Sequence, residues 1–128
     1  FDMVWNREIE VETSIARENK HKAWAEQPQT IDEVGSIYTV QGFDLNFAGV
    51  ILGPSVKYRD GRIVMDPSES YFKAATNNRT LSDGSKQSFG IELLWNQFYV
   101  LLTRGVKGLY IYAVDDELRK ALLAAQQD

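Results

Sequence analysis

The sequence contains no cysteine and a single histidine, His21. The first absence excludes disulfides, thiolate zinc sites and cysteine nucleophiles, and one histidine cannot build a histidine metal cluster. We therefore expect no metal site. No apolar run approaches the length of a membrane span and no signal peptide leads the chain, so we expect no membrane partner and a cytoplasmic location.

The pattern G-x-x-x-x-G-K-[ST] is also missing, which excludes a Walker-type phosphate-binding loop from these 128 residues. The chain opens on Phe1-Asp2-Met3 without an initiator methionine, and we interpret it as part of a longer protein. Its net charge of −4 gives none of the basic excess that a free-standing nucleic-acid binder usually carries.

The composition is that of a folded domain, with 44% hydrophobic and 25% charged residues. Six Phe, six Tyr and three Trp supply large side chains for a core. We predict a single domain over residues 1–128. Polar and charged residues dominate 7–29 and 66–88, which we expect to be surface insertions with at most a short helix in each.

Hydrophobic periodicity places the secondary structure. The predicted elements are strands at 2–6, 36–40, 48–54 and 109–114, helices at 91–102 and 115–125, and a hairpin at 56–59 and 62–65 around Asp60-Gly61. Glu8, Glu10 and Glu12 alternate with apolar residues and extend the first strand. Continuous apolar strands that alternate with helices predict an α/β fold, with a mostly parallel sheet flanked by helices and a β-hairpin insertion.

Gln41 and Gly42 follow the β-prone run at 36–40 and precede an apolar strand. In open α/β sheets, ligands bind beyond the carboxyl ends of strands, and glycine lets a backbone approach a phosphate closely. The pair is therefore a candidate ligand loop. An ordinary turn with glycine at positive φ explains the same two residues.

Thr103 and Arg104 follow the long predicted helix. A cation at a helix C-terminus is favoured by the helix dipole, so Arg104 can be a simple capping residue. It can also act as an arginine finger, whose guanidinium offers two parallel donors to a γ-phosphate and stabilises charge in the transition state. The residues by themselves leave both interpretations open.

The order of the two loops along the chain and their amino-acid sequences resemble known motifs. Residues 34–45 (VGSIYTVQGFDL) resemble motif V of superfamily 1 helicases, and residues 99–105 (YVLLTRG) resemble motif VI. Over roughly residues 31–122 the chain is similar to the C-terminal part of a bacterial family catalogued as Schlafen group 3-like DNA/RNA helicases.

This resemblance implies the second, C-terminal RecA-like lobe of an ATP-dependent DNA/RNA helicase or translocase. Arg104 would be the catalytic arginine finger. The residues implied for the nucleotide and coupling loop are Thr39, Gln41, Gly42, Asp44 and Thr103. ATP and Mg²⁺ would be held by the phosphate-binding loop of an N-terminal lobe, so we expect this chain alone to bind neither and to be inactive. Single-stranded nucleic acid is the implied substrate.

The chain departs from the family pattern at two positions within the first motif. Tyr38 stands where the family usually has histidine, which removes the polar contact that a histidine would make. Asp44 stands where helicases in general have glutamate. Residues 7–27 also form a longer insertion than is usual.

Other functions fit parts of the sequence. A non-catalytic helicase-like module could serve as a platform for proteins or nucleic acid. The carboxylates of Glu8, Glu10 and Glu12 suggest a metal-dependent nuclease, although alternating glutamates usually form only the solvated side of an edge strand.

A small basic cluster lies near Trp24. Its members are Arg17, Lys20, His21 and Lys22. Such residues bind single strands through phosphate contacts and base stacking. They are also typical of a solvated charged face.

Overall fold

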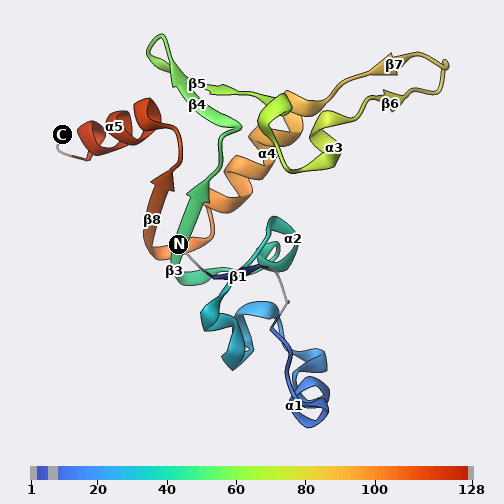
Figure 1. Ribbon diagram of the computed structural model, residues 1–128, viewed down its shortest axis with the longest axis vertical. Helices are drawn as coiled ribbons and strands as arrows, with labels where there is room; N and C mark the ends of the chain where they lie inside the picture. The colour runs from blue at the N-terminus through green and yellow to red at the C-terminus, as the bar shows by residue number, and fades with distance from the viewer. Residues whose placement is uncertain (1–2, 6–8, 127–128) are drawn as a thin grey trace.

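The computed structural model describes residues 3–5 and 9–126, and its ribbon is drawn in Figure 1. Its strands are β1 (Val4–Trp5), β2 (Glu33–Val34), β3 (Leu45–Leu52), β4 (Val56–Arg59), β5 (Arg62–Met65), β6 (Arg79–Thr80), β7 (Lys86–Gln87) and β8 (Gly105–Ala113). Its α-helices are α1 (Thr13–Glu18), α2 (Ile37–Val40), α3 (Lys73–Thr76), α4 (Gly90–Leu102) and α5 (Asp116–Ala125). Its 3-10 helices are η1 (Asn19–His21), η2 (Trp24–Glu26), η3 (Pro28–Asp32) and η4 (Pro67–Glu69).

These elements confirm the α/β class. The described residues form four two-stranded sheets rather than one larger sheet. β1–β2 and β3–β8 pair in parallel, whereas β4–β5 and β6–β7 are antiparallel. The RecA-like arrangement and the single domain over 1–128 stay predictions.

The parallel β3–β8 pair carries the core. Leu45 pairs with Gly105 at one end and Leu52 with Ala113 at the other, with a bulge near the start. Side chains alternate across a strand, so one face of the pair collects every second residue, and Leu94 of α4 packs against that face. The hydrophobic cluster built on this face consists of Val50, Leu52, Val56, Met65, Leu94, Ala113 and Leu118.

The opposite face of the β3–β8 pair is largely exposed. Its large apolar side chains are Phe47, Ile51, Tyr110 and Tyr112, and all are exposed, Tyr110 to 69%. The guanidinium carbon of Arg119 lies over the ring of Tyr112, 4.9 Å from its centroid. The accessible surface of the whole chain is 9342 Å². A compact monomer of this mass exposes only about 6,900 Å². The fold therefore buries less surface than a compact monomer of the same mass does.

The β4–β5 hairpin lies where the sequence predicts it. Val56 pairs with Met65 and Arg59 with Arg62, which leaves Asp60-Gly61 as a two-residue turn. Both turn residues have positive φ, 52° for Asp60 and 76° for Gly61. This is the backbone that a type I′ hairpin requires, and it is why Asp-Gly is such a strong turn signal.

Arg59 joins this hairpin to the start of α5. Its Nη2 lies 2.8 Å from Oδ2 of Asp115 and its Nη1 lies 3.1 Å from Oδ1. Asp115 also caps α5, because its Oδ1 accepts from the backbone N–H of Leu118 at 2.9 Å. The hydrogen bonds from the Arg59 guanidinium hold the pKa of Asp115 well below its usual value of 3.8. We call these two side chains the latch.

The prediction of a strand at 36–40 is wrong, because this segment forms the short helix α2. The N–H of Gln41 donates to the carbonyl of Ile37 at 2.9 Å, which closes the helical turn. Thr39 and Val40 are buried on its inner side, and α2 packs against η2 and α4. Strand propensity mainly measures how well a side chain fits a half-buried pleated surface, so tertiary packing can override it.

The predicted strands at 48–54 and 109–114 and the predicted helices at 91–102 and 115–125 are confirmed with adjusted bounds. The limit of one short helix in each insertion is wrong, because 7–29 holds α1, η1 and η2.

Of the strand predicted at 2–6, Val4–Trp5 is present as β1, and residues 6–8, with Glu8 of the alternating glutamates, lie outside the described residues. Residues 9–12 form no strand. The segment 66–88 holds η4 and α3 and also the short hairpin β6–β7, which Figure 1 shows projecting from the body.

Among the helices of the described residues, none combines the length and apolar character that crossing a membrane demands.

The latch generates a test of stability against pH. Asp115→Asn keeps a side chain that caps helices as well as aspartate does, but it loses the charge. Because the folded pKa of Asp115 is depressed, its contribution is present above the unfolded pKa near 3.8 and is lost as the pH falls through the lower folded pKa. We expect the variant to unfold several degrees below the wild type at neutral pH.

The difference in unfolding temperature should shrink once the pH falls below about 3.8, and thermal unfolding followed by circular dichroism measures it. Asp116→Asn is the matched control, because Asp116 is exposed and pairs only within α5, with Arg119 at 3.1 Å. Equal pH profiles for the two variants would show that the latch contributes no stability.

Candidate functional site

The two candidate loops meet at one edge of the β3–β8 pair. Residues 41–44 lead into β3 and residues 103–104 lead into β8, so both loops lie at the amino ends of paired parallel strands. The N–H of Leu45 donates to the carbonyl of Arg104 at 2.8 Å, which ties the loops at their base. The expectation that Gln41 and Gly42 follow the carboxyl end of a strand is wrong, because α2 precedes them.

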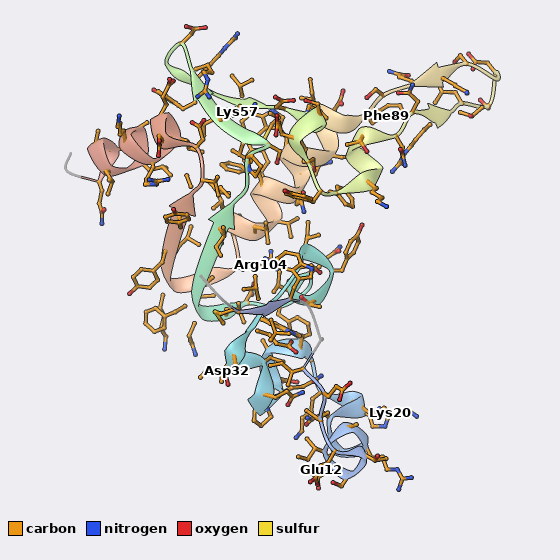
Figure 2. The ribbon with its side chains drawn as sticks, viewed as in Figure 1. Glu12, Lys20, Asp32, Lys57, Phe89 and Arg104 are labelled. Atoms are coloured by element: carbon orange, nitrogen blue, oxygen red, sulfur yellow. The ribbon has the colours of Figure 1, made fainter. Side chains whose placement is uncertain are left out.

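Arg104 is the centre of this junction, and Figure 2 labels it where the sheet meets the N-terminal part of the chain. α4 ends at Leu102, so Arg104 lies just beyond its C-terminus, as predicted. Its Nε donates to the carbonyl of Val100 at 2.9 Å, and its Nη1 donates to the carbonyl of Phe43 at 3.0 Å. One guanidinium therefore bonds the last turn of α4 and the other loop at once.

Thr103 and Asp44 complete the set around Arg104. Nη2 of Arg104 donates to Oγ1 of Thr103 at 3.2 Å, and this hydroxyl in turn donates to the carbonyl of Tyr99 at 2.9 Å. Oδ1 of Asp44 lies 3.7 Å from Nη1 of Arg104. The carboxylate of Asp44 is 74% exposed, so solvent screens this ion pair and its effect on stability is small.

Thr39, Gln41 and Gly42 stand apart from the guanidinium. Thr39 is buried and its Oγ1 donates to the carbonyl of Ser36 at 2.8 Å, so it stabilises the turn of α2. Gly42 has φ of 88°, a left-handed backbone that favours glycine. No hydrogen bond or ion pair within the described residues links these three to Arg104. The structure thus brings Arg104, Thr103 and Asp44 together, and it does not bring Thr39, Gln41 or Gly42 to the guanidinium.

The junction also depends on backbone groups that the sequence does not reveal. The carbonyl oxygens of Phe43 and Val100 hold the guanidinium, and any residue type supplies a carbonyl. Beside the junction, Gln41, Asn96 and Gln97 help to line a hollow of about 190 Å³. The last two are amides within the stripe of α4 that faces α2, and this signal is visible in the sequence.

Glycine is required where β8 leaves the junction. Leu45 pairs with Gly105 and Phe47 with Gly108, so the β8 strand has one extra residue, which makes a bulge. A Cβ on Gly105 would collide with the carbonyl oxygen of Gly108, which is backbone and cannot move aside easily. Bulges often occur next to functional sites, and this one begins directly after Arg104.

A second hollow, of about 380 Å³, lies over the latch. Its charged lining is largely engaged in ion pairs, since Lys57 contacts Asp66 at 2.6 Å and Arg59 contacts Asp115 and Glu117. These pairs occupy the donors and acceptors that a ligand would need, and they explain the hollow as part of the hairpin's attachment to α5.

The basic cluster lies on α1 and η1, and Figure 2 shows Lys20 there, well away from Arg104. Arg17 and Lys20 are exposed. Trp24 is half-buried and its Nε1 donates to Oε2 of Glu33 at 2.8 Å, so this indole takes part in the fold. The cluster is therefore a charged surface without the stacking ring that the sequence suggested.

The acidic residues give no metal centre within the described residues, where no three His, Cys, Asp or Glu side chains are grouped to hold an ion. Glu10 and Glu12 are exposed, and Glu8 lies outside the described residues.

Comparison with known proteins adds two findings. A family model described as Schlafen group 3, DNA/RNA helicase domain matches residues 1–115. An uncharacterized protein of Saccharomyces cerevisiae is 48% identical over 102 residues, which are 78% of this chain and 22% of the relative. The chain therefore spans less than a quarter of that relative's length. No solved structure matches the chain.

The bulge generates a test of the junction. Gly105→Ala should lower the free energy of unfolding by about 1–3 kcal/mol, because the new methyl group overpacks against the Gly108 carbonyl. Gly49→Ala is the control on the same strand pair, since a Cβ there meets open space. Urea denaturation measures both. A Gly105→Ala protein as stable as the Gly49→Ala protein would contradict the tight backbone approach.

Proposed function

Because the chain belongs to the Schlafen group 3 DNA/RNA helicase domain family, we propose that it supplies the second, RecA-like lobe of an ATP-dependent helicase or translocase. Arg104 is the proposed arginine finger, and the loop from Gln41 to Asp44 is the proposed coupling segment. The observation that carries the proposal is the junction, in which the guanidinium of Arg104 bonds both the last turn of α4 and the loop before β3.

The donor set of the junction suits an anionic phosphate that approaches from another lobe. A guanidinium has five N–H groups, and the three hydrogen bonds of Arg104 use one on each nitrogen. One N–H on Nη1, whose nitrogen lies 3.7 Å from Oδ1 of Asp44, and one on Nη2 make no hydrogen bond within the described residues, and the Arg104 side chain is 21% exposed. Two parallel donors are what bidentate phosphate binding uses. The carbonyls that hold the other N–H groups fix the orientation in advance, which favours catalysis by positioning.

The rest of the nucleotide site has to come from elsewhere. The chain contains no G-x-x-x-x-G-K-[ST] loop. The described residues contain no cluster of three or more His, Cys, Asp or Glu side chains that could hold a metal ion. ATP and Mg²⁺ would therefore be bound by an N-terminal lobe, and Arg104 would supply charge stabilisation at the γ-phosphate. We expect the chain alone to have no ATPase activity, and we place the protein in the cytoplasm.

The proposed substrate track is single-stranded nucleic acid. The name of the family includes both DNA and RNA. With a net charge of −4, the chain would rely on local cations rather than on an overall basic field. Arg17 and Lys20 offer such cations on the exposed face of α1 and η1.

One observation favours a second candidate, a non-catalytic platform for proteins or nucleic acid. Three hydrogen bonds of Arg104 end on groups of this chain, and a purely structural arginine would make the same contacts. In that case the guanidinium would serve only to join α4 to the loop before β3.

Substitution of Arg104 separates the two functions. In the longer protein that contains this domain, Arg104→Ala should lower the rate of ATP hydrolysis by about 10³–10⁵-fold, because an arginine finger acts mainly in the transition state. ATP affinity, measured by titration calorimetry, should change far less. Steady-state ATPase assays give the rate.

Arg119→Ala is the matched control for that experiment. Arg119 also bonds backbone carbonyls, those of Ala113 at 2.9 Å and Val114 at 3.2 Å, but it lies on α5 away from both loops. A finger predicts loss of turnover in the first variant alone. Equal losses of thermal stability with normal turnover in both would favour the platform and sink the finger.

A further inference from the structure

The 190 Å³ hollow beside the junction has polar chemistry that the arginine finger does not use. α2 and its C-terminal cap supply Tyr38 and Gln41, the residue before α3 supplies Phe72, and α4 supplies Asn96 and Gln97. These elements pack together, since α2 and α3 both contact α4. We refer to these five residues as the amide pocket.

The position of the two amides on α4 is unusual. Leu93, Asn96, Gln97 and Val100 all line the hollow and follow the spacing i, i+3, i+4, i+7. That spacing marks the face of a helix that packs against its neighbour, where apolar residues are expected. Here leucine and valine occupy the ends of the stripe and two primary amides occupy its middle.

The amides have no partners of their own. Within the described residues, no hydrogen bond involves the side chain of Gln41, Asn96 or Gln97, whereas the side chains of the nearby Thr103 and Arg104 each make hydrogen bonds. Gln41 and Asn96 are exposed and Gln97 is half-buried, so the three groups are accessible from solution. Each amide provides one acceptor and two donor hydrogens.

Aromatic rings stand beside these amides. Tyr38 and Phe72 meet edge to face, with centroids 6.0 Å apart and planes at 60°. Tyr38 is 69% exposed, so much of its ring surface is free to receive another ring. Phe72, in contrast, is partly buried against the core and holds Tyr38 in place.

This combination defines a ligand class. No charged side chain lines the hollow, so an ion is not the fitting ligand. The hollow is open to solvent, and its volume of about 190 Å³ is smaller than the roughly 300–1,000 Å³ of sites for drug-sized molecules, so a single small ring system fits it best. Amides that read donor and acceptor edges, next to an aromatic face that stacks, are how proteins hold an unstacked base. We propose that the amide pocket binds one nucleobase.

We assign the base to a single strand of nucleic acid, and this assignment rests on the proposed function. The pocket's ability to bind a base does not depend on that function, because a free nucleotide carries the same ring. Val100 lines the hollow, and its carbonyl accepts a hydrogen bond from Nε of Arg104. A base bound in the hollow would therefore contact a residue that bonds the proposed finger directly. A base held there would connect strand binding to the guanidinium.

The test uses this chain with three probes that differ only in their bases and connectivity. They are single-stranded oligoadenylate, the same strand made abasic, and adenosine monophosphate. Fluorescence anisotropy gives the affinity for the strands, and the side-chain amide signals of Asn96 and Gln97 in nitrogen–proton NMR spectra report occupancy. We expect the intact strand to bind about tenfold tighter than the abasic strand, since base stacking and hydrogen bonding supply the difference.

Three variants give the residue assignment. Asn96→Leu combined with Gln97→Leu removes the amides and completes the apolar stripe, so the protein should stay folded while the preference for the intact strand disappears. Tyr38→Ala should weaken the intact strand about tenfold, and Tyr38→Phe should restore it. Gln87→Leu, which changes an exposed amide on β7, is the matched control and should bind as the wild type does.

The outcomes separate the sources of the base from failure of the proposal. Shifts of the Asn96 and Gln97 amide signals with adenosine monophosphate, without preference for the intact strand, would support the pocket and assign it to a free nucleotide. Equal binding of intact and abasic strands together with unshifted amides would overturn it. The ATPase experiment on Arg104 is independent, so the helicase assignment can survive loss of the pocket.

Discussion

The parallel pairing of β3 with β8 is the constraint on which the rest of the structure depends. The two strands are separated by more than fifty residues of sequence, and their register brings Leu45 opposite Gly105. That register places both motif loops at one edge, and it creates the apolar face on which α4 and the core cluster pack. Loss of the pairing would remove the core and the junction around Arg104 together, because both are built on the same ladder.

The sequence predicts the elements with strong local signals, such as the hairpin and the long helix, and it also identifies Arg104 as the main residue of the junction. Asp60-Gly61 needs positive φ at both positions, so the hairpin could be located to the residue. The long apolar helix ending before Arg104 was equally visible. The segment around Thr39 was misassigned, because its β-branched and aromatic residues fit a buried helical turn as well as a strand when η2 and α4 supply the contacts. Local propensity cannot report such contacts.

The site was predictable only in part for a different physical reason. Arg104, Thr103 and Asp44 carry chemistry in their side chains, and motif spacing finds them. The groups that hold the guanidinium are main-chain carbonyls of Phe43 and Val100, which exist at every residue and are selected by geometry alone. Asn96 and Gln97 are visible in the sequence as two amides in an otherwise apolar stripe. Their role could not be predicted, because the sequence does not show that this stripe of α4 faces α2.

The largely exposed face of the β3–β8 pair has a thermodynamic consequence. Heat capacity rises on unfolding because apolar surface becomes hydrated, and here Phe47, Tyr110 and Tyr112 are hydrated already. The chain should therefore unfold with a smaller heat-capacity change and a shallower dependence on denaturant than its length alone implies. Its stability curve would be correspondingly flat, and anything that covers this face would steepen the curve as well as raise it.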